Sequence, residues 1–294
     1  MTNFRRTPRV HDIASRWVAE GGAEPVDAAS GRHSIDAVVE LGSVTKTVTG
    51  TLLDRMATKG LVDPDEPIEC WVEVPAGTGI TPRLLAEHRS GLPRLPPGIP
   101  MLSSQPYQDF DRTALAAAIA RLPSLVKGQG RVRYSNFGYA VLGAALSAAG
   151  GQSWYELARQ HVLDPLDLAG IVDERPTVGS LAGVDRHGQE RQPWVMLSTM
   201  APVGGLWGSV RDVSRYARSL LVEGALGPPS AAWQLDRGVL WHSGGTRDAA
   251  VHVAVDPDRK SSVVVHTFGL GPYRTDKLGM ALVGSPAGNA VVSP

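Results

Sequence analysis

The chain has 294 residues, of which 43% are hydrophobic and 20% charged, and its 29 Lys and Arg residues balance 29 Asp and Glu residues. These proportions are ordinary for a soluble globular protein that is large enough to bury a substantial core. A net charge of zero leaves no basic field for phosphates, which argues against a nucleic acid partner. The single cysteine, Cys70, cannot form an internal disulfide and is expected in the apolar core.

The sequence gives no reason to expect a membrane partner. No apolar run reaches the roughly 18 residues that a membrane-spanning helix needs. Residues 1–10 carry three arginines without a following apolar segment, so a secretory signal is not expected and the chain is expected in the cytoplasm.

The first part of the chain predicts two helices and one strand. Residues 11–20, which end at a glycine pair, predict a short helix. Residues 36–41 have little alternation and predict a short buried strand, whereas residues 43–56 have apolar positions at helical spacing.

The middle of the chain predicts a loop and several helices. Residues 93–100 contain four prolines and must form a loop. Further helices are expected after Asp111, over 137–149, over 154–163 and after Ser209.

The last part of the chain changes character. Residues 238–243, 249–255 and 261–267 are rich in valine and predict neighbouring antiparallel strands. We therefore predict an α+β fold, in which an antiparallel sheet flanked by helices carries an inserted, mainly helical domain. The sheet domain would comprise residues 1–60 and 205–294 and the helical domain residues 61–204, with the active site in the cleft between them.

A serine and a lysine at the start of the second predicted helix could form a nucleophile and its base. Ser43 and Lys46 are three residues apart, so they share one helix face. A desolvated lysine can lose its charge and accept the serine proton. Taken alone, this S-x-x-K spacing is weak, and a helix-capping serine beside a solvated lysine is the simpler interpretation.

Two later stretches carry residues that suit the same chemistry. Tyr134 could shuttle a proton beside an ammonium, and the amide of Asn136 could bind a substrate carbonyl. His242, Ser243, Gly244 and Gly245 lie at the end of a predicted strand, along which a substrate could bind. The Gly245 N–H would form an oxyanion hole with that of Ser43.

Together, in this order, the three stretches resemble the serine β-lactamase and penicillin-binding-protein superfamily. The Tyr-Ser-Asn and His-Ser-Gly versions are most similar to class C β-lactamases, D-Ala-D-Ala carboxypeptidases, D-aminopeptidases and β-lactamase-like esterases. Residues 40–47, 84–93 and 201–207 are similar to further family stretches.

The resemblance implies a role for each matching residue. Ser43 would be the acylated nucleophile, while Lys46 and Tyr134 would share general acid and base work. Asn136 would contact the acyl carbonyl, and His242, Ser243 and Gly244 stand at the family's K-T-G or H-T-G position. His88 and the pair Gly204-Gly205 are given structural roles. No metal or organic cofactor is implied.

The sequence departs from the family near its beginning. Only about twenty residues separate Gly22 from Ser43, so the family's N-terminal β-hairpin is expected to be shortened or absent, leaving about three strands instead of five. Such a sheet would expose an edge, and a homodimer across that edge is a hypothesis.

The sequence leaves three functions open. The first is hydrolysis of a small ester, amide or lactam through a Ser43 acyl-enzyme. The second is transfer of the same acyl group to an amine or alcohol in small-molecule biosynthesis. The third, which has less support because all three motifs are intact, is a catalytically silent binding protein.

Overall fold

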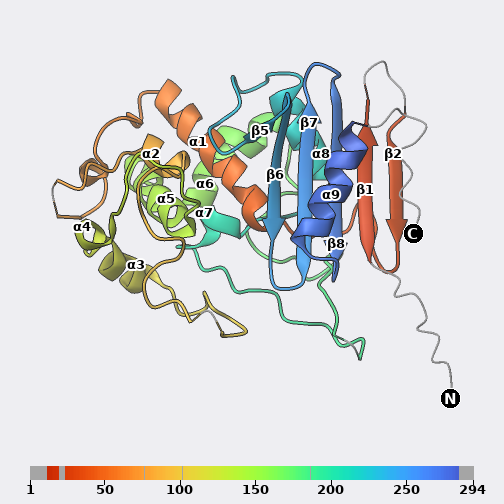
Figure 1. The fold of residues 1–294 in the computed structure, drawn as a ribbon, viewed down its shortest axis with the longest axis horizontal. Helices are drawn as coiled ribbons and strands as arrows, with labels where there is room; N and C mark the ends of the chain where they lie inside the picture. Colours follow the sequence, from red (N-terminus) through yellow and green to blue (C-terminus); the bar gives the residue numbers. More distant parts are fainter. Residues whose placement is uncertain (1–11, 20–23, 76, 101, 186, 285–294) are drawn as a thin grey trace.

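The computed structural model describes residues 12–19, 24–75, 77–100, 102–185 and 187–284. The prediction that residues 1–10 contain no secretory signal therefore concerns residues outside the described ranges. The described chain forms an antiparallel sheet with helices on both faces and a lobe of helices beside it (Figure 1). This arrangement confirms the predicted fold class, whereas the domain boundaries stay a prediction.

The main sheet has six strands in the order β2-β1-β8-β7-β6-β5, and every neighbouring pair is antiparallel. The three valine-rich runs at the end of the chain form β6, β7 and β8 side by side, as predicted. The strands are β1 (Ile13–Val18), β2 (Val26–Ser30), β5 (Gln234–Asp236), β6 (Val239–Gly245), β7 (Ala249–Asp256) and β8 (Ser261–Phe268).

The helix predicted over residues 11–20 is wrong in its described part, because residues 13–18 form β1. β1 pairs with β2 on one side and β8 on the other, so the hairpin that we expected to be missing is present. Ala14 belongs to one core of the protein and Trp17 to another, so both faces of the strand are covered. A strand covered on both faces loses the alternation that would have identified it. The argument for a dimer from missing strands loses its basis.

Two helices cover the opposite faces of the sheet. α8 (Val210–Leu221) contacts strands β1, β7 and β8 on one face, and α9 (Pro272–Val283) contacts β6, β7 and β8 on the other (Figure 1). Successive side chains of β8 alternate between the two cores: Val264 packs on the α8 side, while Val263 and Val265 pack against α9. The sheet therefore separates a large core from a small one.

The helical lobe packs around α1 (Thr45–Thr58) and α5 (Asn136–Gly150). The predicted helix starts are confirmed by side chains that accept backbone N–H groups, among them Asp111 and the capping boxes Ser153–Glu156 and Ser209–Asp212. The remaining helices are α2 (Pro82–Ala86), α3 (Arg112–Ile119), α4 (Leu122–Leu125), α6 (Trp154–Ala158) and α7 (Ala201–Gly204), with short 3₁₀ or π turns at Gly42–Val44, Ile68–Cys70, Arg159–Leu163 and Asp164–Leu166.

Three smaller observations complete the fold. A two-stranded ladder joins β3 (Val39–Glu40), the buried strand predicted before Ser43, to β4 (Trp207–Gly208). Cys70 is exposed, so its expected place in the core is wrong. None of the helices in the described ranges is both long and apolar enough to cross a membrane.

Candidate active site

The nucleophile segment is a tight turn between β3 and α1. Gly42 has a φ of +48°, and a Cβ at this position would lie 3.0 Å from the backbone nitrogen of Gly245. Both the left-handed conformation and this close approach require glycine. The turn places Ser43 in the 3₁₀ turn that leads into α1, beside the end of β6.

Ser43 lies between the two side chains predicted to move its proton. The nitrogen of Lys46 is 3.0 Å from the Ser43 hydroxyl oxygen, and the phenol oxygen of Tyr134 is 2.8 Å from that same oxygen. Tyr134 comes from the segment before α5, far from Ser43 in the sequence. The fold therefore brings the predicted hydroxyl, amine and phenol within hydrogen-bonding reach.

Lys46 is buried, with no exposed surface. Its nitrogen donates a hydrogen bond to the carbonyl oxygen of Val203 at 2.7 Å. Burial, helped by the positive charge of Arg94, holds the pKa of Lys46 well below its ordinary value of 10.5. A neutral amine beside Ser43 can act as the general base.

Tyr134 is held in its protonated form. Burial raises the pKa of its phenol above the ordinary value of 10, although the hydrogen bond with Ser43 and the charge of Arg94 oppose that rise. Burial thus favours the protonated phenol of Tyr134 and the neutral amine of Lys46, a pair in which Lys46 can accept a proton and Tyr134 can donate one.

His88 supports Tyr134 from behind, in the structural role that we predicted. Its ring centroid lies 4.5 Å from that of Tyr134, and its Nδ1 accepts the backbone N–H of Ser135 at 3.1 Å. Burial lowers the pKa of His88 to about 3, so its ring is neutral at neutral pH. A neutral ring with Nδ1 as acceptor fixes the chain on both sides of Tyr134.

The end of β6 leaves a free strand edge beside Ser43. β5 pairs with β6 only as far as Trp241, so residues 242–245 have no β5 partner. The N–H of Thr246 donates to Ala249 of β7, and the alternation of an antiparallel strand turns the N–H of Gly245 the other way, toward Gly42. This geometry suits the predicted oxyanion hole.

The hydroxyl of Ser243 is bonded on the α9 side of the sheet. Its hydroxyl donates to Asp276 of α9 at 2.6 Å and lies 3.0 Å from Nδ1 of His252. It therefore faces α9, whereas the neighbouring Gly244 faces Leu41, where a Cβ would come within 2.1 Å of the carbonyl oxygen. Ser243 stabilises the strand instead of presenting its side chain to Ser43.

His242 and Asn136 lie near Tyr134, as the motif order predicted. His242 is 2% exposed, and burial lowers its pKa to about 3, so it is neutral at neutral pH. Asn136 is the first residue of α5, and its side-chain oxygen is buried without a hydrogen-bond partner. Such an unpaired group is available to a substrate.

Three residues of the site escaped the sequence analysis. Val203 acts through its carbonyl group, which every residue has, so no sequence signal marks it. Arg94 follows the Leu92-Pro93 stretch of the motif, and its guanidinium lies 5.3 Å from the centroid of the Tyr134 ring. Glu40 was quoted only as part of the nucleophile segment, yet its carboxyl accepts a hydrogen bond from Thr246 at 3.0 Å.

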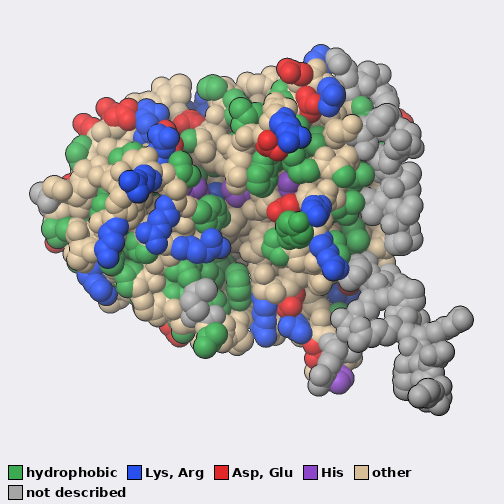
Figure 2. Space-filling model, in the orientation of Figure 1, with side chains coloured by type: hydrophobic (Ala, Val, Ile, Leu, Met, Phe, Trp, Pro, Cys, Tyr) green, Lys and Arg blue, Asp and Glu red, His purple; other side chains and the backbone are tan. Residues whose placement is uncertain are grey.

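A cavity of about 650 Å³ adjoins the site and is lined by Tyr134, His88, His242 and residues near the start of β5. Figure 2 shows histidine side chains at the centre of one face, beside lysine and arginine side chains gathered on the helical lobe. Among the described residues, no group of three His, Cys, Asp or Glu side chains is placed to hold a metal ion.

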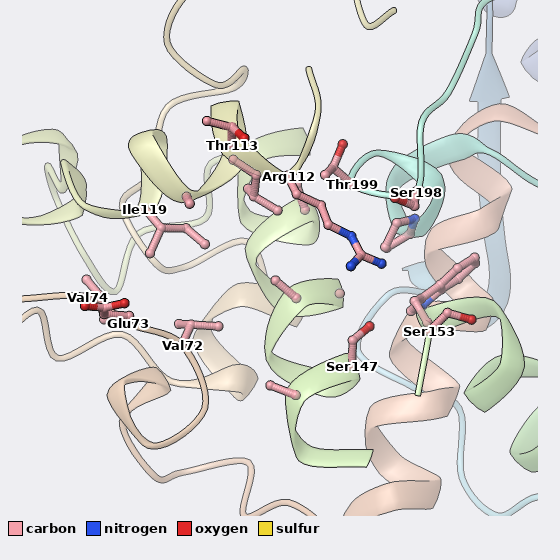
Figure 3. Close-up of a pocket in the computed structure, with 18 of the residues that line it drawn as sticks. Val72, Glu73, Val74, Arg112, Thr113, Ile119, Ser147, Ser153, Ser198 and Thr199 are labelled. Carbon is pink, nitrogen blue, oxygen red and sulfur yellow. The ribbon is translucent and has the colours of Figure 1, made fainter. Parts of the chain in front are cut away.

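A larger cavity, of about 1420 Å³, lies within the helical lobe. Figure 3 shows Arg112 reaching from α3 into the space between α5 and the segment of Ser198 and Thr199. Neither Ser43 nor its two proton-transfer partners line this cavity, so we place the chemistry in the smaller one.

Comparison with known proteins matches the chain to one protein family and to curated relatives. The Beta-lactamase family model matches residues 14–237, which include Ser43, Lys46 and Tyr134. The D-alanyl-D-alanine-carboxypeptidase/endopeptidase AmpH of Escherichia coli is 28% identical over 65% of this chain and 50% of its own length. The esterase/beta-lactamase LipL of Mycobacterium tuberculosis is 28% identical over 57% of this chain and 37% of its own length. The chain thus spans half or less of these two curated relatives.

The fold has matches among solved structures. A class C beta lactamase from Rhodobacter sphaeroides superposes with a TM-score of 0.73 over 90% of this chain and 92% of that chain, at 18% sequence identity. At this level of identity the match shows the fold alone.

Proposed function

The chain belongs to the Beta-lactamase family, and from that premise we propose that it is a serine hydrolase that forms an acyl-enzyme on Ser43 with a small ester, amide or lactam. The observation that carries the proposal is the position of the Ser43 oxygen, 3.0 Å from Lys46 and 2.8 Å from Tyr134. A neutral amine and a protonated phenol at these distances are the base and the acid that acyl transfer needs.

In the proposed acylation, the Ser43 oxygen attacks the substrate carbonyl while its proton passes to the Lys46 nitrogen. The negative charge that develops on the carbonyl oxygen is stabilised by the backbone N–H groups of Ser43 and Gly245. As the bond to the leaving group breaks, Tyr134 donates a proton to that group and is reprotonated from Lys46. The products are the acyl-enzyme and the free alcohol or amine; when the substrate is a lactam, the amine stays attached to the acyl group.

In the proposed deacylation, water replaces the leaving group. The neutral Lys46 accepts a proton from water, the resulting hydroxide attacks the acyl carbonyl, and the Ser43 oxygen leaves with a proton from Tyr134 or Lys46. The enzyme returns to its starting protonation state, and the product is a free acid.

The relatives support this substrate class without narrowing it. One is named as a carboxypeptidase and endopeptidase and another as an esterase and beta-lactamase. All of these names describe transfer of an acyl group from a leaving group to water. The intact three-residue arrangement also weighs against a catalytically silent binding protein.

The proposal is tested by covalent labelling of the whole chain. We expect one adduct by intact mass when the wild type is incubated with a fluorophosphonate or a fluorescent penicillin, and hydrolysis of 4-nitrophenyl esters to the free acid. Ser43→Ala should form no adduct and should lose on the order of 10⁶-fold in turnover. Ser124→Ala, which removes an exposed hydroxyl from the helical lobe, should behave as wild type. A wild type without adduct or turnover would overturn the proposal.

A further inference from the structure

Arg94 lies beside the ring of Tyr134. Its guanidinium carbon is 5.3 Å from the centroid of the Tyr134 ring, while the Lys46 nitrogen lies 5.0 Å from that centroid. The backbone carbonyl of Arg94 accepts N–H groups from Asn136 and Phe137 at 2.8 and 3.3 Å, which ties the residue to the start of α5. The position of Arg94 is thus fixed relative to the residues that would surround a substrate.

The positive charge of Arg94 is not neutralised by the protein. Arg94 is exposed, and within the described ranges it takes part in no ion pair. Lys46, the other cationic residue over the Tyr134 ring, is buried, and burial favours its neutral form. His242 is neutral at neutral pH, and Arg89, which lines the cavity beside Tyr134, lies 4.0 Å from the carboxylate of Glu87. Arg94 therefore offers a positive charge at this ring without such a partner among the described residues.

The surroundings of Arg94 also favour an anion. Arg131 and Arg133 are exposed and lie in the segment just before Tyr134, where the backbone N–H of Arg133 bonds to the carbonyl of His88. Figure 2 shows lysine and arginine side chains gathered over this lobe. Such a field attracts anions toward the cleft, and a guanidinium then pairs with a carboxylate in a fixed geometry.

We propose that Arg94 selects substrates that carry a carboxylate, by pairing with it while Ser43 attacks the ester or amide carbonyl. This inference rests on the proposed hydrolase function and names its substrate class as anionic acyl compounds. Arg94 is a specificity residue in this account, since it touches the substrate and takes no part in moving the proton.

The test compares neutral and anionic esters that are otherwise matched. One pair carries the charge on the acyl group: 4-nitrophenyl hexanoate and mono-4-nitrophenyl adipate. The other pair carries it on the leaving group: the acetate esters of methyl 4-hydroxybenzoate and of 4-hydroxybenzoate. The quantity measured is the ratio of kcat/KM for the anionic ester to that for its neutral partner, in wild type, Arg94→Gln, Arg94→Lys and Arg259→Gln.

We expect Arg94→Gln to lower this ratio about tenfold in at least one pair, as for loss of one charged hydrogen bond. Arg94→Lys should recover part of the ratio, and Arg259→Gln, which removes an exposed charge from the turn between β7 and β8 at the far end of the sheet from Gly245, should leave it almost unchanged. Loss of the Arg94 charge should also let the pKa of Lys46 rise toward its ordinary value. This change alters the hydrolysis of both esters of a pair equally, so it cancels in the ratio of their kcat/KM values.

The outcomes separate the two proposals. If Arg94→Gln hydrolyses both members of each pair in the wild-type ratio, Arg94 is not a specificity residue, and the hydrolase proposal stands. If the wild type neither hydrolyses nor is acylated by any of the four esters, both proposals fail together.

Discussion

The nitrogen of Lys46 lies 2.7 Å from the carbonyl oxygen of Val203. A neutral amine has two N–H groups and one lone pair. The carbonyl of Val203 takes one N–H and thereby leaves the lone pair free for the proton of Ser43, 3.0 Å away. The short helix α7 therefore orients the base through the backbone carbonyl of Val203.

Replacing Lys46 should lower turnover and should change how the free energy of unfolding depends on pH. We expect Lys46→Met to lose nearly as much turnover as Ser43→Ala, because Tyr134, which also lies within hydrogen-bonding distance of the Ser43 hydroxyl, keeps its own proton and cannot take that of Ser43. The folded chain keeps Lys46 neutral at a pH where the unfolded chain carries it protonated, so unfolding takes up a proton. Raising the pH should therefore stabilise the wild type relative to Lys46→Met, by up to about 1.4 kcal/mol per pH unit, below the ordinary pKa of 10.5.

The measurement is urea unfolding of both proteins at pH 7, 8 and 9. The two stability curves should diverge steadily across this range. Parallel curves would show that Lys46 is protonated in the folded protein, and the assignment of the base would then be wrong.

Removing the Tyr134 hydroxyl should slow catalysis without disturbing the fold. Tyr134→Phe keeps the ring that packs on His88 and loses the group that lies 2.8 Å from Ser43. We expect kcat to fall on the order of 10²–10⁴-fold, as for loss of general acid–base help. Tyr273→Phe, at a position that is 70% exposed, is the matched control and should keep wild-type kcat. An unchanged kcat in Tyr134→Phe would remove Tyr134 from the mechanism.

Glu40 should make the protein less stable as the pH rises toward neutrality. Burial raises the pKa of its carboxyl from 4.5 to about 7, although hydrogen bonds from Thr246 and Trp194 oppose this. Between these two values the folded chain keeps the proton that the unfolded chain releases. Stability contributed by the protonated carboxyl is present in full below pH 4.5 and is lost as the pH rises to about 7, by on the order of 3 kcal/mol.

Glu40→Gln tests this expectation, because it keeps a hydrogen-bonding side chain that cannot ionise. Between pH 4.5 and 7, the unfolding free energy of the wild type should fall relative to that of Glu40→Gln. Above pH 7, the difference between the two proteins should stay constant. Glu223→Gln, at an exposed position, should show no such trend. A flat difference for Glu40→Gln would mean that the carboxyl ionises normally in the folded chain.

The sequence by itself determined the local parts of this protein. Helix starts at Asp111, Ser153 and Ser209 follow from side chains that accept the backbone N–H three residues further along the chain. The pairing of Ser43 with Lys46 follows from helix periodicity, and the three valine-rich runs predicted β6, β7 and β8. In each case the residues that decide the outcome are close together in the chain.

Only the tertiary structure decided the rest. β1 was misread as a helix because cores on both of its faces hide the alternation of a strand. The neutral state of Lys46 depends on burial among residues from α5 and α7, and the role of Arg94 depends on its approach to a ring forty residues away. Burial and the distance between charges are set by packing of remote segments, and these two quantities fix which groups at the site are charged.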